Sequence, residues 1–193
     1  MFEQLFKSIQ EKVTLTQDEM EVCKTFFIPK KLRKKQTLLQ EGDICIYNAF
    51  VEKGIMRSFF IDEKGNEHIV QFAIEGWWIT DLSSFLTNTN SIYTIEALED
   101  CELLLFTTEA REALMEKIPM FERYQRLLLQ NAYIANQARI NSALTETAEE
   151  KYIKLGIAYP GIIKRVPQHM IASYLGLKPE TLSRVRKQIS NRL

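Results

Sequence analysis

The chain has 193 residues, of which 46% are hydrophobic, so it can bury one large core or two smaller ones. Its 25 basic and 25 acidic residues cancel, and with two histidines and three cysteines without CxxC spacing it is unlike a metal or iron–sulfur protein. There is no signal-peptide pattern and no apolar run approaching the roughly 18 residues of a membrane span, so we expect a cytoplasmic protein with no membrane partner.

The N-terminal part is predicted to be two helices followed by an antiparallel β-domain. Apolar residues from Phe2 to Val13 repeat at helical spacing, and Thr16 with Glu19 forms a capping-box pattern for a second helix. From residue 28 to 107, short runs rich in β-branched and aromatic residues alternate with turn signals, which indicates a barrel or sandwich. The expected strands are Lys31–Leu38, Tyr47–Glu52, Ile55–Ile61, His68–Ala73, Tyr93–Ala97 and Cys101–Thr107, with a hairpin at Asp62–Asn66 in which Gly65 takes a positive φ.

Helical spacing returns after Thr108. We expect a short helix at Glu109–Lys117, a long one over residues 119–144, and a third that starts at a capping box formed by Thr147 and Glu150 and ends before Pro160. One seam of the long helix has the spacing of a coiled coil, and its members are Phe121, Tyr124, Leu128, Asn131, Ala135, Ala138 and Ser142. This seam predicts pairing with a second copy, although packing of the helix on its own β-domain would give the same spacing.

Charge is unevenly distributed along the chain. Residues 161–193 carry seven Lys/Arg and one Glu, whereas the preceding 160 residues hold more acids than bases, 24 against 18. A basic end on an acidic body is typical of a protein that meets an acidic polymer, although a solvated basic helix would also produce it. Two short helices are expected here, Gln168–Leu175 and Pro179–Asn191, joined at Gly176. A glycine at the sharp turn between two crossing helices indicates a helix-turn-helix.

The second of these helices has polar residues on its outward positions. Arg184 can donate two hydrogen bonds to guanine and Glu180 can accept one from cytosine, while Thr181 and Ser183 can bond bases or phosphates. Further basic residues suit phosphate contacts, which position a protein without reading sequence. They are Lys164, Arg165, Arg186 and Lys187.

Two stretches resemble the cAMP receptor protein/Fnr (Crp/Fnr) superfamily of bacterial transcription regulators: FVEKGIMRSFFIDEKGNEHIVQFAIEGWWITDLSSF (Phe50–Phe85) and IASYLGLKPETLSRVRKQI (Ile171–Ile189). The second holds the E-T-x-S-R pattern of the Fnr-like branch, so the resemblance implies that Glu180, Ser183 and Arg184 contact bases. It also implies an α+β fold in three parts. These are an antiparallel β-roll of the cyclic-nucleotide-binding type (a double-stranded β-helix) with flanking helices at 1–118, a dimerisation helix at 119–144 and a helix-turn-helix domain at 145–193. The family's common downstream wing is not expected, because the sequence stops shortly after the second helix.

The loop that holds cAMP in some members of that superfamily is altered here. Those members use a G-E-L/I-A…R-S/T-A pattern, whose Glu binds the ribose and whose Arg pairs with the cyclic phosphate. The same positions hold Thr80, Asp81 and Ser91, so a phosphate would have no cationic partner and we expect no tight cAMP binding. The effector-pocket candidates are Thr80, Asp81, Leu82, Ser83, Ser91 and Ile92.

Other sensing chemistries of that superfamily are also not supported. The N-terminal cysteine cluster of the oxygen-sensing branch is missing, and His68 is expected to be an exposed strand residue rather than a haem ligand. Trp77, Trp78 and Tyr93 could line an apolar pocket, but core packing explains them as well.

The sequence thus predicts a non-enzymatic, homodimeric transcription regulator that needs no cofactor or metal and binds double-stranded DNA at a two-fold symmetric site. RNA polymerase is a candidate partner. One alternative is a cyclic-nucleotide or small-ligand-binding signalling module whose C-terminal helices contact only proteins. A cupin-like enzyme is a further alternative, but it would need clustered His and Glu ligands.

Overall fold

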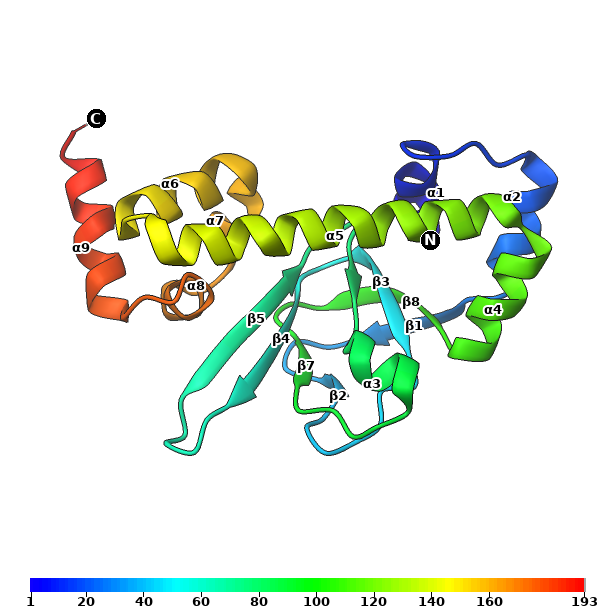
Figure 1. The fold of residues 1–193 in the computed structure, drawn as a ribbon, viewed down its shortest axis with the longest axis horizontal. Coiled ribbons are helices and arrows are strands. Elements are labelled where there is room, and N and C mark those ends of the chain that lie inside the picture. The colour runs from blue at the N-terminus through cyan, green and yellow to red at the C-terminus, as the bar shows by residue number, and fades with distance from the viewer. Residues whose placement is uncertain (193) are drawn as a thin grey trace. The chain divides into compact units, whose positions relative to one another are not determined.

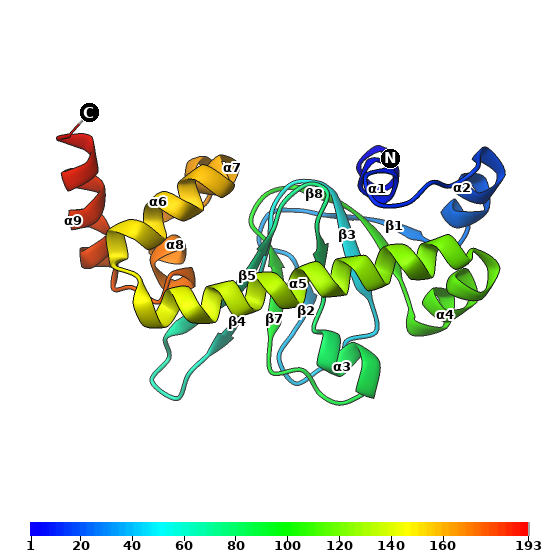
Figure 2. The same cartoon turned by 45° about the horizontal axis from the view of Figure 1, so that its top comes forward.

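The computed structural model describes residues 1–192, which divide into two compact units. The first unit comprises Met1–Phe60 and Gln71–Gln130, and the second comprises Ile61–Val70 and residues 131–192. Figures 1 and 2 show the elements of both. The first unit contains nearly all of the sheet residues and the second contains the C-terminal helices, which confirms an α+β fold with antiparallel sheets. No helix in the described part of the chain is both long and apolar enough to span a membrane.

The first unit begins with two short helices, α1 (Glu3–Gln10) and α2 (Gln17–Lys24). The predicted capping box of α2 is confirmed, because Thr16 and Glu19 bond each other's backbone N–H groups. At the start of α1, the backbone N–H of Leu5 donates to the nearly buried Glu52 carboxylate at 2.8 Å. A carboxylate at a helix N-terminus satisfies unpaired amides and complements the helix dipole, so it fixes α1 on the sheet.

The β-roll consists of two four-stranded sheets. One has the order β1-β8-β3-β6 and the other β2-β7-β4-β5. The pairs β1–β8, β8–β3, β3–β6, β2–β7 and β7–β4 are all antiparallel. The strands are β1 (Ile28–Leu32), β2 (Thr37–Leu39), β3 (Asn48–Lys53), β4 (Met56–Ile61), β5 (Glu67–Ala73), β6 (Trp78–Ile79), β7 (Thr94–Ala97) and β8 (Cys101–Phe106). Strands β3 and β8 are almost wholly buried, so the core lies between the sheets and their covering helices.

One predicted strand was wrong. Lys31–Leu38 is not continuous, because β1 ends at Leu32 and pairs with β8, while β2 begins at Thr37 and pairs with β7 in the other sheet. The change of sheet occurs in a turn at residues 33–36, where Lys35 has a φ of 69°. The sequence has no glycine or proline there, so the usual turn signal is missing. The two-residue strand β6 and the short helix α3 (Leu82–Thr87) were not predicted either.

Helices α4 (Thr108–Lys117) and α5 (Pro119–Thr145) follow the roll. Both were predicted to within a residue or two, but the seam proposed along α5 does not form one free surface. Phe121 and Tyr124 are fully buried and belong to the core of the first unit, and Leu128 packs against that core. Three- and four-residue spacing marks an apolar stripe without saying what covers it, and here the alternative reading, packing on the helix's own domain, holds for the first part of the seam.

The second unit contains the β4–β5 hairpin tip and the C-terminal helices. The hairpin at Asp62–Asn66 is confirmed, with Gly65 at a φ of 81°. The helices are α6 (Ala148–Ala158), α7 (Pro160–Arg165), α8 (Gln168–Tyr174) and α9 (Pro179–Ser190). Thr147 and Glu150 cap α6 as predicted. Pro160 ends α6 but also begins the unpredicted α7, because a helix tolerates proline in its first turn.

Candidate nucleic-acid interface and effector site

The helix pair α8–α9 is held by a small apolar core. Ile171 and Ala172 on α8 are fully buried, and Leu182 and Val185 on α9 are at most 7% exposed. The turn between the helices places Gly176 at a φ of 67°, in the left-handed region that favours glycine, and the N–H of Leu177 donates to the Ala172 carbonyl at 2.9 Å. These contacts fix the side of α9 that faces inward, and therefore also the side that faces outward.

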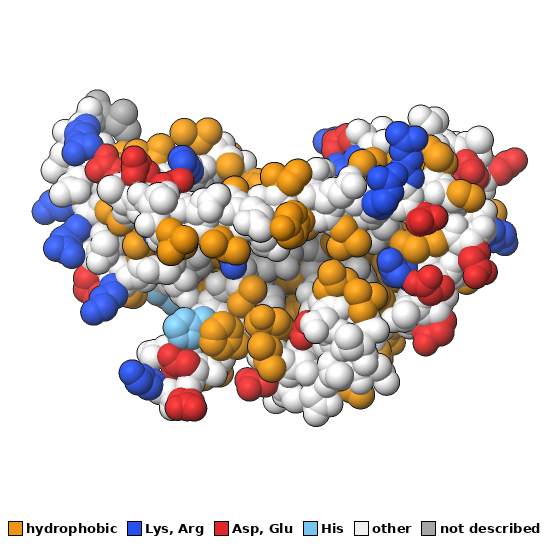
Figure 3. All heavy atoms as spheres, in the orientation of Figure 1, with side chains coloured by type: hydrophobic (Ala, Val, Ile, Leu, Met, Phe, Trp, Pro, Cys, Tyr) orange, Lys and Arg blue, Asp and Glu red, His pale blue; other side chains and the backbone are white. Residues whose placement is uncertain are grey.

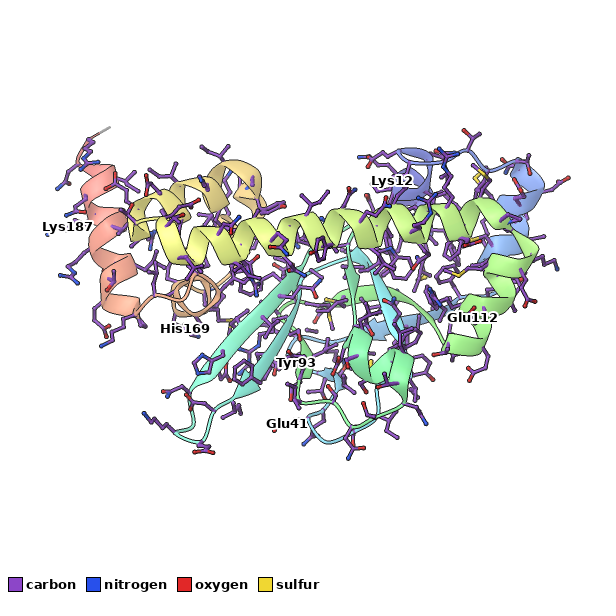
Figure 4. All side chains as sticks on the ribbon, in the orientation of Figure 1. Lys12, Glu41, Tyr93, Glu112, His169 and Lys187 are labelled. Carbon is purple, nitrogen blue, oxygen red and sulfur yellow. The ribbon has the colours of Figure 1, made fainter. Side chains whose placement is uncertain are left out.

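The outward side of α9 carries Glu180, Ser183, Arg184 and Lys187, all of them exposed. At about 100° per residue, these four positions fall within an arc of about 100° opposite the buried residues. Within residues 1–192, no hydrogen bond or ion pair is found for any of the four side chains. Figure 4 shows Lys187 pointing away from α9 into solvent, and Figure 3 shows Lys and Arg side chains gathered over this helix. We call this set the outward face of α9.

The other predicted DNA contacts are placed differently. Thr181 is half-buried, and Arg186 is exposed but lies outside the arc of the outward face. Lys164 and Arg165 are exposed at the C-terminal end of α7, on a different helix. The structure therefore brings four of the eight candidates onto one surface of one helix.

A contact that the sequence did not indicate joins the hairpin tip to α8. The Ser173 hydroxyl donates to the Glu67 carbonyl at 2.8 Å and accepts from the Ile69 N–H at 3.0 Å, as a neighbouring strand would. Arg139 donates to the Val70 carbonyl at 2.5 Å, and its guanidinium lies 5.3 Å from the centre of the Tyr174 ring. Because these partners are about 70 to over 100 residues apart, no local sequence pattern could have predicted the contact.

The hairpin tip itself is held by Asp62. Its carboxylate accepts from His68 at 2.9 Å and from Asn66, and these hydrogen bonds hold the pKa of Asp62 well below its usual range. His68 lies on β5 with its side chain 46% exposed, which agrees with the prediction of an exposed strand residue.

Two effector-pocket candidates bond each other in a buried corner of the roll. The Ser91 hydroxyl donates to Asp81 Oδ2 at 2.7 Å, and the two residues are 2% and 6% exposed. The other oxygen of Asp81 accepts from the N–H groups of Ser83 and Ser84, so Asp81 is the N-cap of α3. An aspartate ahead of a helix is a known start signal, which sequence reasoning could have used here. We call this arrangement the Asp81–Ser91 corner.

The remaining candidates do not face this corner together. Thr80 donates to the Tyr47 carbonyl at 3.2 Å, while Leu82 and Ile92 are 39% and 62% exposed and Ser83 is exposed too. A separate cavity of about 260 Å³ is lined mostly by aliphatic side chains of the β2–β3 region and of β7, with no Lys or Arg among the lining residues. A cavity without a cation is poorly suited to a phosphate group.

The aromatic residues near the corner belong mainly to the core. The Trp78 ring packs at 5.1 Å on both Phe50 and Phe106, and its indole N–H donates to the buried Tyr124 hydroxyl at 3.0 Å. Tyr93 lies 6.3 Å from the Phe60 ring. No group of three or more His, Cys, Asp or Glu side chains suited to a metal ion occurs in the described residues.

Comparison with known proteins places this architecture in one class. The cyclic nucleotide-binding domain family matches residues 29–118. The chain is 27% identical over 186 residues to the regulatory protein HlyX of Actinobacillus pleuropneumoniae, covering 89% of this chain and 76% of that one. It is 25% identical to the fumarate and nitrate reduction regulatory protein of Vibrio cholerae, with 89% and 73% covered. The solved structure of FixK2 from Bradyrhizobium japonicum has the same fold, with a TM-score of 0.68, 18% identity and 86% and 85% covered.

Residues 29–118 thus match a cyclic nucleotide-binding domain, and the relatives that the chain matches are regulatory proteins, not enzymes. The chain resembles transcription regulators of the Crp/Fnr family, with relatives 25–27% identical over 89% of its length.

Proposed function

We propose that this chain is a transcription regulator that binds double-stranded DNA as a homodimer, with one copy of α9 reading each half of a two-fold symmetric operator. The observation that carries the proposal is the outward face of α9, where acceptors and donors able to bond base edges are exposed and unpaired on a helix whose inner side is firmly packed. The division of labour expected from the sequence supports it, with a sensor domain at 1–118, a dimerisation helix at 119–144 and a DNA-binding domain at 145–193.

The roles on α9 follow from chemistry. Arg184 is the candidate for a bidentate contact with guanine, Glu180 for a cytosine amino group, and Ser183 for a neighbouring base or phosphate. Lys187, Arg186, Lys164 and Arg165 supply phosphate contacts, which give affinity without sequence preference. Thr181, which is half-buried, is proposed to bond a base or phosphate at the start of the helix.

Dimer formation is proposed through the exposed side of α5. Between residues 131 and 145 this side shows large apolar side chains at near-heptad spacing: Tyr133 is 66%, Ile140 56% and Leu144 80% exposed. Asn136 lies between them, at a seam position where one polar residue can fix register. A second copy would cover this stripe. The predicted seam through Asn131, Ala135 and Ala138, which are exposed too, stays the alternative pairing surface.

The effector is proposed to be something other than cAMP. The positions that would bind the ribose and the cyclic phosphate are occupied by side chains that bond each other in the interior, and no arginine is present among them. Titration of cAMP into the purified protein, followed by calorimetry, should give no heat of binding. A dissociation constant in the low micromolar range would contradict this expectation.

The cytoplasm is the compartment proposed for this activity, and RNA polymerase is a candidate partner. Selection from a pool of randomised duplexes tests the central proposal. It should enrich a two-fold symmetric sequence whose half-sites lie about one helical turn apart. A pool that stays random after repeated rounds would instead favour the signalling module whose C-terminal helices contact only proteins.

A further inference from the structure

A groove of about 430 Å³ lies between α4 and the first part of α5. All of its lining residues belong to the first unit. The α5 residues that line it recur every three or four positions and therefore share one side of that helix; they are Glu122, Gln125, Arg126 and Leu129. Figures 1 and 2 show α4 and the start of α5 in succession. The volume is within the range of small-molecule sites, so the groove can hold a ligand.

Two hydrogen-bond donors in the groove are largely buried and poorly satisfied. Gln125 is 7% exposed, and its Nε2 has no hydrogen-bond partner in the described part of the chain. The Arg111 side chain is 18% exposed, and the one ion pair found for it within residues 1–192 is with its neighbour Glu112, although a guanidinium has five N–H donors. A buried donor without an acceptor opposes folding, so both groups call for an acceptor that the described chain does not supply.

The neighbouring Tyr124 shows that polar groups buried in this part of the unit can be satisfied. Its hydroxyl lies 2.9 Å from the Ser8 hydroxyl and accepts from the Trp78 indole at 3.0 Å. Gln125 instead lines the groove. The terminal torsion of a glutamine side chain is soft, so its amide can turn toward a bound group.

The groove also carries acids without partners. Glu116 on α4 and Glu122 on α5 are exposed and have no ion pair within residues 1–192. Glu122 lies four residues before Arg126, a spacing that favours an ion pair on a helix, yet none is found between them. Glu112 and Glu116 are four apart on α4, where like charges destabilise a helix. These acids do not stabilise the helices, and they suit a ligand with a positive group.

Apolar side chains complete the lining. Met115 on α4 is half-buried, and Leu129 on α5 is 46% exposed. We call these two residues the apolar wall. Covering them with an apolar group would remove hydrophobic surface from water, which favours binding.

We propose that the α4–α5 groove binds a free α-amino acid with an aliphatic side chain. The ligand carboxylate accepts from Gln125 and Arg111, its ammonium group donates to Glu116 or Glu122, and its side chain packs on the apolar wall. A simple anion fits less well, because the lining holds three acids and two bases. A simple cation would leave the buried donors unsatisfied. The site is a candidate for the effector of the proposed regulator, but binding there does not depend on DNA.

The test is calorimetric titration of the full chain, without DNA, with leucine, isoleucine, valine and methionine. Two analogues of leucine each lack one charge: isocaproate lacks the ammonium group, and isoamylamine lacks the carboxylate. Arg111→Gln and Gln125→Leu each remove one buried donor. Arg123→Gln and Gln130→Leu make the same changes at exposed positions of α5 outside the groove and serve as matched controls.

At least one of the four amino acids should bind. Where leucine binds, each analogue should bind at least about ten-fold more weakly, because it loses hydrogen bonds to a charged group. Arg111→Gln and Gln125→Leu should weaken amino-acid binding by at least about ten-fold for the same reason, and both controls should match the wild type. Gln125→Leu should unfold at no lower temperature than the wild type, since it replaces an unsatisfied buried amide with an apolar group.

The inference would be overturned by a wild type that binds none of the four, by an analogue that binds as tightly as leucine, or by donor variants that bind as the wild type does. Sedimentation velocity on the same variants tests a second copy as the occupant. A Gln125 variant that no longer dimerises, beside a wild type that binds no amino acid, would assign the groove to that contact instead. Operator selection is a separate measurement, so the failure of this site and the failure of the proposed function are distinguishable.

Discussion

The Asp81–Ser91 corner and the outward face of α9 use the same kinds of polar side chain in opposite ways. In the corner, carboxylate and hydroxyl bond each other and are almost fully buried. On α9, a carboxylate, a hydroxyl and two cations are exposed and have no partner in residues 1–192. Polar groups satisfied inside a protein contribute to stability, whereas unpaired groups on a rigid helix are available to a ligand.

The two regions therefore differ in what their polar groups are free to do. The loop that carries Asp81 forms a self-contained cap for α3, because Asp81 accepts from two backbone N–H groups and from the Ser91 hydroxyl. The face of α9, in contrast, retains the residue types of its motif. Substitutions in the two regions should therefore affect different measurements.

The largest effect on operator affinity is expected from a substitution that prevents dimer formation, because the proposed operator binding uses the outward face of α9 from both copies. Ile140→Glu places a charge in the exposed apolar stripe of α5 and should give a monomer with at least about 100-fold weaker operator binding, because the second half-site no longer adds to the first. Sedimentation velocity and fluorescence anisotropy measure the two quantities. Ala138→Glu, on the opposite side of α5, serves as the control and should remain dimeric. Dissociation of the Ala138 variant alone would restore the seam predicted from the sequence.

Disruption of the corner should affect stability without affecting DNA affinity. Asp81→Ala removes the cap of α3 and the closer of the two acceptors of the buried Ser91 hydroxyl, which keeps only the Tyr93 carbonyl at 3.2 Å, so the free energy of unfolding should fall by about 1–3 kcal/mol. Urea unfolding measures this change. Glu63→Ala, at an exposed position of the β4–β5 hairpin turn, is the control and should change stability by no more than about 0.5 kcal/mol. Operator affinity of the folded Asp81 variant should equal that of wild type, and a loss there would link the corner to DNA binding.

Changes on the outward face should have the reverse pattern. Arg184→Ala should weaken binding to the selected operator by about 1–3 kcal/mol and relax the preference at one base pair, while Arg186→Ala should weaken all duplexes alike and reduce the salt slope by about 1. Competition binding against single-base operator variants distinguishes the two. Neither variant should alter the free energy of unfolding by more than about 0.5 kcal/mol. An Arg184 variant that keeps the full base preference would exclude base reading by this residue.

The sequence by itself determined the features that depend on neighbouring residues. The capping boxes of α2 and α6, the hairpin at Asp62–Asn66, the glycine turn before α9 and the outward positions of Glu180, Ser183 and Arg184 all follow from local periodicity and turn chemistry. In each case the relevant contacts lie within a few residues along the chain, so the pattern contains the information.

Only the tertiary structure decided the features that depend on distant partners. The covered side of α5 is set by the burial of Phe121 and Tyr124. The change of sheet between β1 and β2 is set by their pairing with β8 and β7. The hydrogen bonds of Ser173 are made with a hairpin more than 100 residues away. The bond between Asp81 and Ser91 likewise requires the two loops to meet. Periodicity shows that a side is apolar or polar, but burial is settled by whatever packs against it, and that depends on the whole fold.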